Sequence, residues 1–418
     1  MSLKNIKITT LENGIKVISE RIKFVNSFSL GFWFNVGSAD ETEDVNGISH
    51  FLEHMFFKGT VKRSAKKIAE DVESLGAYLN AFTSKEHTCF YGRGLNMHMP
   101  KIFEVLADMV QNSLFKPSDI SKESGVVIDE LYDIEDSPEE LIFDKFESNV
   151  FNGNTIGMPI IGTVDNLKKF KRKDLQKYVD ENYTLDRMFI VASGNIDHTD
   201  LIKLAKKFVT RKFKSTNDKK RSIILQPSND LFVEKETQQT HFILGKPTYG
   251  YKDKERVILS VMSHILGEGS SSRLFQKLRE ENGITYQINS FLNSFYDMST
   301  FGVYLSTNEK TFFKAQKLVY EEIKKIKSKL VSNEELERAK QYLIGNMLLS
   351  LESVNNRQMR IAQSYIYFGK IKSTKETIDK INAVSKKEII NFANELFENG
   401  TLTRVILSQK NLLLSKAA

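Results

Sequence analysis

The chain contains a single cysteine, Cys89, among its 418 residues. One thiol can form neither an intrachain disulfide nor a cysteine zinc site, and such scarcity is typical of reducing compartments. Long apolar runs are also missing: residues 1–7 contain no signal-peptide core, and no segment approaches the roughly 18 apolar residues of a membrane span. We therefore predict a cytosolic (cytoplasmic) protein without membrane insertion.

Recognisable nucleic-acid-binding motifs are absent too, although the formal net charge is +7. Lysines are spread along helical stretches such as residues 321–329, which indicates solvated helix faces rather than a basic binding patch. We therefore predict no nucleic-acid partner. The composition that remains, 40% hydrophobic and 27% charged, is typical of a globular protein. A chain of this length exceeds one ordinary core, which favours two domains.

The sequence carries a weak internal repeat. Residues 241–245 echo residues 28–31, and residues 263–268 lie where residues 49–54 would recur, followed by strand-like and helical segments in the same order. The second copy keeps one histidine, His264, but loses the rest of the pattern. We therefore predict that only the first copy binds a metal and that His264 packs or hydrogen-bonds structurally.

A polar, basic stretch separates the two copies. It covers residues 213–225 and has the composition of a linker. This division predicts an N-terminal domain over residues 1–212 and a degenerate C-terminal copy over residues 226–418.

The first copy contains the stretch His50-Phe51-Leu52-Glu53-His54. On a helix, positions i, i+3 and i+4 share one face, so His50, Glu53 and His54 can point at a common spot. Two imidazoles can hold Zn²⁺, and a carboxylate between them can take a proton from metal-bound water. The order H-x-x-E-H is the inverzincin signature. The bare pattern also arises by chance, and histidine pairs on helices are often ordinary surface or core features.

Catalytic zinc usually has a third protein ligand. Residues 123–131 are predicted to be helical, and Glu123 and Glu130 are seven residues apart, on one face. Glu130 is therefore a candidate to complete a His₂Glu site, although helical carboxylates are usually just solvated.

With these residues in view, the chain resembles the pitrilysin superfamily of inverted zincins. Within it, the resemblance is to single-chain bacterial proteins similar to the β-subunit of the mitochondrial processing peptidase. The family pattern is H-x-x-E-H, then a ligand glutamate about 75 residues later, with another glutamate seven residues before that. The resemblance implies one zinc per chain, held by His50, His54 and Glu130. It also implies Glu53 as general base and Glu123 as a supporting carboxylate.

Two further segments resemble substrate-binding parts of the family. The first is the strand containing Asn80, Ala81 and Thr83, whose edge pairs with an extended substrate; an ordinary core strand would look the same. The second contains Arg279 and Tyr286, seven apart, which in the family contact the substrate backbone, with the tyrosine stabilising the oxyanion. Without the family, Arg279 would be read as a surface charge and Tyr286 as a buried aromatic.

A third match concerns specificity. Glu140 and Asp144 stand ten and fourteen positions after Glu130, where processing peptidases recognise an arginine two residues before the cut. They are four apart on a predicted helix and can grip one guanidinium together. Acidic residues in a first helical turn also complement the helix dipole without any substrate. A pocket including Phe57 would accept an aromatic residue after the cut.

The duplication and the resemblance together imply an α+β fold of two duplicated domains. They imply an N-terminal zinc-binding catalytic domain over residues 1–212 and a C-terminal, degenerate, substrate-binding domain over residues 226–418. Each is expected to have a mixed, largely antiparallel sheet with helices packed mainly on one face. In the family, four such domains enclose a clamshell chamber, which implies a homodimer or a paralogous partner chain. The expected function is a zinc endopeptidase acting on unfolded oligopeptides or presequence-like segments. The alternative is a non-catalytic structural subunit of a peptidase or respiratory complex, but such relatives have usually lost part of the zinc motif.

Overall fold

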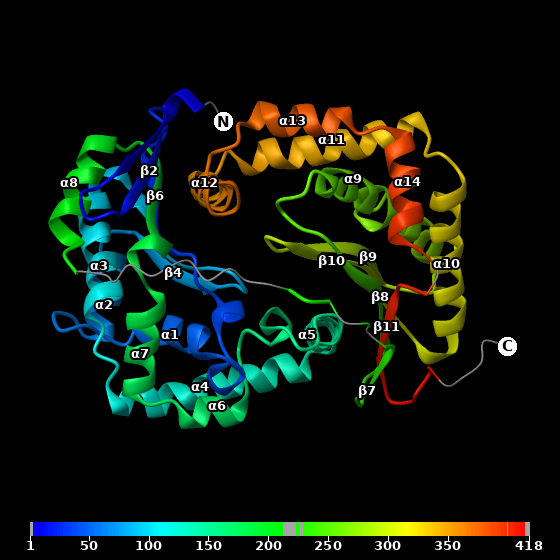
Figure 1. Ribbon diagram of the computed structural model, residues 1–418, viewed down its shortest axis with the longest axis horizontal. Coiled ribbons are helices and arrows are strands. Elements are labelled where there is room, and N and C mark those ends of the chain that lie inside the picture. Colours follow the sequence, from blue (N-terminus) through cyan, green and yellow to red (C-terminus); the bar gives the residue numbers. More distant parts are fainter. Residues whose placement is uncertain (1–2, 212–222, 226, 228, 399, 414–418) are drawn as a thin grey trace. The chain divides into compact units, whose positions relative to one another are not determined.

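The computed structural model describes residues 3–211, 223–225, 227, 229–398 and 400–413 (Figure 1). The chain divides into two compact units, each built from three segments. Unit 1 consists of Met1–Tyr132, Met158–Ser222 and Leu349–Ser373, and unit 2 of Asp133–Gly157, Ile223–Leu348 and Thr374–Ala418. Each unit contains one mixed sheet and several helices, so the predicted α+β class with two domains is confirmed.

Unit 1 is organised around a six-stranded sheet in the order β1-β2-β6-β3-β5-β4. Its strands are β1 (Ile6–Thr10), β2 (Lys16–Arg21), β3 (Ser27–Phe34), β4 (Tyr78–Thr83), β5 (Thr88–Leu95) and β6 (Met188–Gly194). Only β2 and β6 pair in parallel. The Asn13-Gly14 pair between two strand-like segments predicts a hairpin. Strands β1 and β2 form it, with Thr10 opposite Lys16 and Gly14 in the left-handed region at φ 87°. Strand β4, which carries predicted substrate contacts, forms one edge of the sheet.

Both faces of this sheet carry helices. The helices of unit 1 are α1 (Ile48–Phe56), α2 (Ala65–Glu73), most of α4 (Pro117–Asp136), α3 (Met99–Asn112), α6 (Val164–Lys169), α7 (Arg172–Asn182), α8 (His198–Phe208) and α12 (Val354–Phe368). On one face, Phe103 of α3 meets Phe32 of β3, with ring centroids 5.1 Å apart. The next residue along the strand, Trp33, points to the other face and packs in a cluster with Ile361 of α12.

Unit 2 repeats this plan with a five-stranded sheet in the order β7-β11-β8-β10-β9. Its strands are β7 (Leu231–Glu234), β8 (Thr240–Tyr249), β9 (Gln287–Ser294), β10 (Met298–Thr307) and β11 (Thr403–Ser408). The β7–β11 pair is parallel and the others are antiparallel, in the same positions as in unit 1 apart from the extra edge strand β1. The shared topology supports the weak repeat seen in the sequence.

The helices of unit 2 also cover both faces of its sheet. They are α5 (Pro138–Val150), α9 (Glu255–Gly267), α10 (Phe312–Ser328), most of α11 (Asn333–Ser350), α13 (Thr374–Ala383) and α14 (Lys386–Leu396). Val303 of β10 belongs to the large apolar cluster with residues of α9, α10 and α14. Its neighbour Tyr304 points the other way, toward Phe143 of α5, with ring centroids 5.4 Å apart.

The structural units differ from the predicted domains by one helix in each direction along the chain. Residues 1–212 include α5, which packs on β8 and β11 of unit 2, whereas residues 226–418 include α12, which packs on β3 and β6 of unit 1. The predicted boundaries are therefore corrected: each sheet receives a helix from the other half of the chain. Most of the predicted linker, 213–225, lies outside the described residues.

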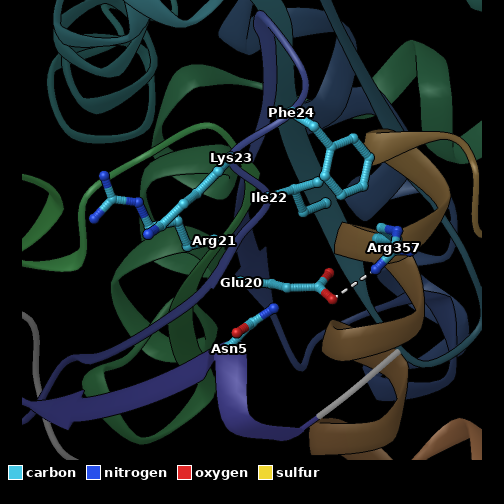
Figure 2. A pocket seen from close by; sticks show the side chains of 7 residues that line it. All are labelled: Asn5, Glu20, Arg21, Ile22, Lys23, Phe24 and Arg357. Atoms are coloured by element: carbon cyan, nitrogen blue, oxygen red, sulfur yellow. Dashed lines mark hydrogen bonds and ion pairs between the residues drawn. The ribbon is translucent and has the colours of Figure 1, made fainter.

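Helix α12 is tied to the six-stranded sheet of unit 1 (sheet 1) by an ion pair between a buried glutamate and a partly exposed arginine. Arg357 donates from Nη1 to Glu20 Oε1 at 2.7 Å, and Glu20 is only 2% exposed. Figure 2 shows this contact in the wall of a cavity of about 390 Å³, which Ile22 and Phe24 also line. Ser193 of β6 donates to the other oxygen of Glu20, so the buried carboxylate has partners on both sides.

None of the helices that the structure describes is long and apolar enough to cross a membrane.

Candidate metal centre

Helix α1 presents a buried apolar face and a polar face. Its fully buried residues include Ile48, Phe51, Leu52 and Met55. The side chains of His50, Glu53 and His54 lie on the other side, where they are only partly exposed. The helical spacing predicted from the sequence is therefore present, and the two imidazoles lie together, with ring centroids 4.8 Å apart.

The start of α1 is held by a buried carboxylate that the sequence did not single out. Glu41 is 1% exposed and accepts hydrogen bonds from the amides of Gly47 and Ser49, both at 2.8 Å. These are among the amides that lack a partner at a helix N-terminus. Burial raises the pKa of Glu41 to about 7, against the opposing effect of these hydrogen bonds. The available signal was an acidic residue shortly before a glycine that precedes the helix.

Glu130 of α4 meets both histidines. Its Oε1 lies 3.7 Å from His50 Nε2, and its Oε2 lies 3.5 Å from His54 Nε2. One ligand atom from each of the three residues lies within 4.8 Å of the others. Two ligands at zinc-bonding distance on a tetrahedral ion are separated by about 3.3 Å. Two imidazoles and one carboxylate at this spacing fit the donor set of a catalytic zinc site.

A second layer of side chains orients His54. Glu123 accepts a hydrogen bond from His54 Nδ1 at 2.9 Å, which directs Nε2 toward Glu130. The other oxygen of Glu123 is 2.6 Å from Lys58 Nζ. The sequence predicted Glu123 as a supporting carboxylate but missed Lys58, although it follows His54 by four residues. By contrast, the buried Nδ1 of His50 has no hydrogen-bond partner among the described residues.

Burial shifts the protonation of two side chains in the directions that a metal hydrolase needs. Desolvation, and then the neighbouring His54, lower the pKa of His50 to about 4, so this imidazole is neutral and free to bind a metal at pH 7. Desolvation raises the pKa of Glu53, while a hydrogen bond from Thr83 opposes the shift. Thr83 Oγ1 donates to Glu53 Oε2 at 2.7 Å. A glutamate with a raised pKa is suited to general base catalysis near neutral pH.

The predicted substrate strand lies beside this centre. Thr83 connects the end of β4 to Glu53, and Asn80 and Ala81 precede it on the same edge strand. The Ala81 amide donates to Asn80 Oδ1 at 2.9 Å. Phe57, the C-terminal cap of α1, is partly buried. The structure thus brings His50, Glu53, His54, Glu123, Glu130 and Thr83 together, and the role of Phe57 stays a prediction.

Arg279 and Tyr286 belong to unit 2. The Arg279 guanidinium stacks over the Tyr286 ring at 4.8 Å, and its Nη1 lies 3.4 Å from the Tyr286 carbonyl oxygen. Tyr286 is 74% exposed, so the alternative of a buried aromatic does not hold. The two residues form one exposed cluster, and their catalytic and substrate-binding roles stay predictions.

Glu140 and Asp144 also lie in unit 2, on α5 as predicted. Glu140 is in the first turn and exposed, and Asp144 is one turn further and partly buried. Nothing in their surroundings tests an arginine preference. In the second copy of the repeat, His264 is buried and stacks on Tyr342 with centroids 4.2 Å apart, in agreement with the predicted structural role.

Comparison with known families places both halves of the chain. A family model described as Insulinase (Peptidase family M16) matches residues 16–164, which include the metal centre. A model described as the Peptidase M16 inactive domain matches residues 169–343, which include His264. The order of these matches agrees with a first copy that carries the metal pattern and a second copy that has lost it.

Relatives over most of the chain agree with this assignment, and solved structures share the fold. The chain is 34% identical to the uncharacterized zinc protease YmxG of Bacillus subtilis, over 97% of this chain and 99% of the relative. It is also 34% identical to an uncharacterized zinc protease of Mycobacterium tuberculosis, over 93% and 90%. A protease from Helicobacter pylori shares the fold, with a TM-score of 0.90 at 22% identity over 96% and 99% of the two chains. A Pseudomonas fluorescens structure described as a peptidase M16 inactive domain also gives a TM-score of 0.90, at 17% identity over 97% and 99%.

Proposed function

Because the chain belongs to the insulinase family of zinc proteases, peptidase family M16, we propose that it is an endopeptidase acting on unfolded oligopeptides or presequence-like segments. One observation carries the proposal: His50, His54 and Glu130 converge within 4.8 Å. Glu53 lies on the same face of α1 as the two histidines, with a carboxylate that Thr83 orients.

The three converging residues would hold the zinc ion, and Glu123 and Lys58 would fix the orientation of His54. Zinc bound there supplies Lewis-acid chemistry, lowering the pKa of water and polarising a peptide carbonyl. Glu53 is then the group that accepts a proton from the attacking water and passes it to the leaving amine. Its raised pKa favours its action as a base toward the water and as an acid toward the amine.

Strand β4 supports an extended substrate. As the outer strand of its sheet it can pair with a peptide through main-chain hydrogen bonds, which give affinity with little dependence on sequence. The Ala81 amide, bonded to the Asn80 side chain, can exchange that bond for one to the peptide. Because Thr83 of the same strand binds Glu53, a peptide on this edge would lie next to the proposed base.

The family resemblance supports further roles for residues of unit 2. Arg279 and Tyr286 would contact the substrate backbone, with the tyrosine hydroxyl stabilising the developing oxyanion. Glu140 and Asp144 would recognise an arginine two residues before the cut, and Phe57 of unit 1 would contact the residue after it. A partner chain, identical or paralogous, would complete a chamber that admits unfolded peptides.

The direct test is the Glu53→Gln variant, assayed for zinc content by elemental analysis and for turnover of a mixed peptide library. We expect the wild-type amount of zinc and at least a 100-fold loss of turnover, the typical contribution of a general base being about 10² to 10⁴. His50→Ala and Glu130→Ala are expected to lose zinc as well as turnover. An exposed glutamate, Glu73, provides the matched control as Glu73→Gln. Wild-type turnover in Glu53→Gln would refute the proposed mechanism.

A further inference from the structure

Unit 1 contains a second concavity outside the metal centre. It has a volume of about 550 Å³ and lies between the first turns of α4, the end of α6 and the start of α7. Its apolar wall includes Ile120, Leu167 and Phe170, each less than 10% exposed, and Pro117. This volume is within the range of roughly 300 to 1,000 Å³ that holds small molecules.

The rim of this pocket is strongly basic. Its charged lining residues are Lys168, Lys171, Arg172 and Lys173, all exposed, and no carboxylate lines the cavity. None of the four side chains forms an ion pair within the described part of the chain. The nearby Asp174 carboxylate instead accepts from the Lys171 backbone amide at 3.0 Å, as part of the helix cap. Four positive charges without counter-charges select an anion.

The cavity in Figure 2 has fewer unpaired cations than the basic-rimmed pocket. There Arg357 is already paired with Glu20, and Arg21 is paired with Asp197 at 3.0 Å. Within the described part of the chain, Lys23 is then the one cation of that lining without an ion pair, whereas the basic-rimmed pocket has four such cations.

The polar groups inside the pocket favour a ligand with an apolar body. Apart from the cations, the polar side chains of the lining are Ser121 and Ser124, and Ser124 Oγ already donates to the Leu167 carbonyl at 2.9 Å. A bound peptide carries a donor and an acceptor at almost every residue and would leave many of them unpaired. An unbranched hydrocarbon chain has no such requirement and needs partners only at its charged end.

We propose that the basic-rimmed pocket binds a fatty-acid-like anion, with its alkyl chain against Ile120, Leu167 and Phe170 and its carboxylate among the cations of the rim. Two lining residues of the pocket adjoin sequence neighbours of the metal centre. The Phe170 ring lies 5.5 Å from that of Phe51, the neighbour of His50, and Ser124 follows Glu123 on α4. Binding itself requires neither zinc nor peptidase activity.

The test is isothermal titration with laurate, kept below its micelle concentration, on zinc-loaded and on chelator-treated full-length protein. Dodecyltrimethylammonium offers the same chain with the opposite charge, and acetate and inorganic phosphate offer an anion without the chain. We expect saturable binding of one laurate per chain in both preparations. The ammonium compound is expected to bind at least tenfold more weakly, with no saturable binding of acetate or phosphate.

Two variants locate the site. Arg172→Glu/Lys173→Glu reverses two rim charges in the first turn of α7, where acidic residues complement the helix dipole and should not hinder folding. Ser121→Asp places a carboxylate in the lining at an exposed position. Each is expected to weaken laurate binding at least tenfold, whereas the matched change Lys314→Glu/Lys317→Glu on α10 leaves it unchanged.

Three results would overturn the proposal. The first is equal affinity for laurate and the ammonium compound, and the second is laurate binding that survives both rim variants. The third is displacement of laurate by a short acidic, leucine-rich peptide at a concentration no higher than that of laurate, which would point to a peptide ligand. Because the titration reads binding directly, failure of the Glu53→Gln experiment would leave these results unaffected.

Discussion

Lys58 lies outside the zinc signature but is expected to affect the metal affinity of the proposed zinc site. Its ammonium group lies 2.6 Å from the buried carboxylate of Glu123, which in turn orients His54. Groups that orient a metal ligand typically contribute a factor of about 10 to 100 in metal affinity. We therefore expect Lys58→Met to weaken zinc binding by about that factor. The measurement is competition with a chelator of known affinity.

The control for this prediction is Lys62→Met, a neighbouring exposed lysine with no contact to Glu123 among those the structure describes. Equal zinc affinities of Lys58→Met and the wild type would mean that Glu123 holds its position without the lysine.

Glu41 predicts a pH dependence of stability in the zinc-free protein. Its pKa is about 7 in the folded chain and about 4.5 when unfolded. Between these pH values Glu41 is ionised in the unfolded chain but still protonated in the folded chain. The free energy of unfolding therefore falls as the pH rises and levels off above about pH 7. Glutamine does not titrate, so wild type should lose stability relative to Glu41→Gln between about pH 5 and about pH 7. Urea denaturation of both proteins across this range is the measurement; a constant difference would contradict the prediction.

The proposed metal ligands could be predicted from the sequence, whereas two residues that support them, Glu41 and Lys58, could not. His50, Glu53 and His54 are close along the chain, and helical geometry alone puts them on one face. Glu130 could be inferred from its type and its place on a helix, with the family pattern supplying the spacing. Glu41 and Lys58 could not be predicted from the sequence because tertiary packing sets their partners. Glu41 accepts from amides at the start of α1, and Lys58 contacts the Glu123 carboxylate of α4.

At the scale of elements, α12 is held to sheet 1 by the Arg357–Glu20 pair. Removing one partner of a buried pair leaves a buried charge and typically costs about 3 to 5 kcal/mol. Because the Arg357 side chain is 20% exposed, we expect Arg357→Leu to lower the free energy of unfolding by up to about this amount in urea denaturation. Adding Glu20→Gln should restore part of the lost free energy of unfolding, because it removes the Glu20 charge that Arg357→Leu leaves without a counter-charge.

A second pair in the same region provides the control. Arg21 and Asp197 are both about half exposed, so Arg21→Leu should cost only about 0 to 1 kcal/mol. Equal effects of Arg21→Leu and Arg357→Leu would show that burial does not distinguish the two pairs.

The order of the elements was more predictable than their allocation to the two sheets. Strand alternation and the Asn13-Gly14 turn predict the first hairpin. A serine before an apolar helical pattern predicts a helix start, and Ser64 is the N-cap of α2. The exchange of α5 and α12 left no such sign. The apolar face of an amphipathic helix shows that it will be buried but does not say on which sheet.

At the scale of the molecule, we expect a dimer in which one chain supplies Glu53 and the other supplies Tyr286 to each site. A heterodimer of Glu53→Gln and Tyr286→Phe chains, purified through two different tags, would then keep one intact site of two and about half of the wild-type turnover. Each variant alone is expected to be nearly inactive. A heterodimer as inactive as its parents, or a protein of monomeric mass by light scattering, would contradict a shared site.

The helix exchange has a consequence for synthesis on the ribosome. The last strand of sheet 1 to be made is β6, but the helix that covers one of its faces, α12, ends at Phe368. At about 5 to 20 residues per second, that face waits on the order of 10 seconds for its cover. During this interval the apolar side chains around Trp33 lack their partners on α12, and the nascent chain offers chaperones this uncovered hydrophobic surface.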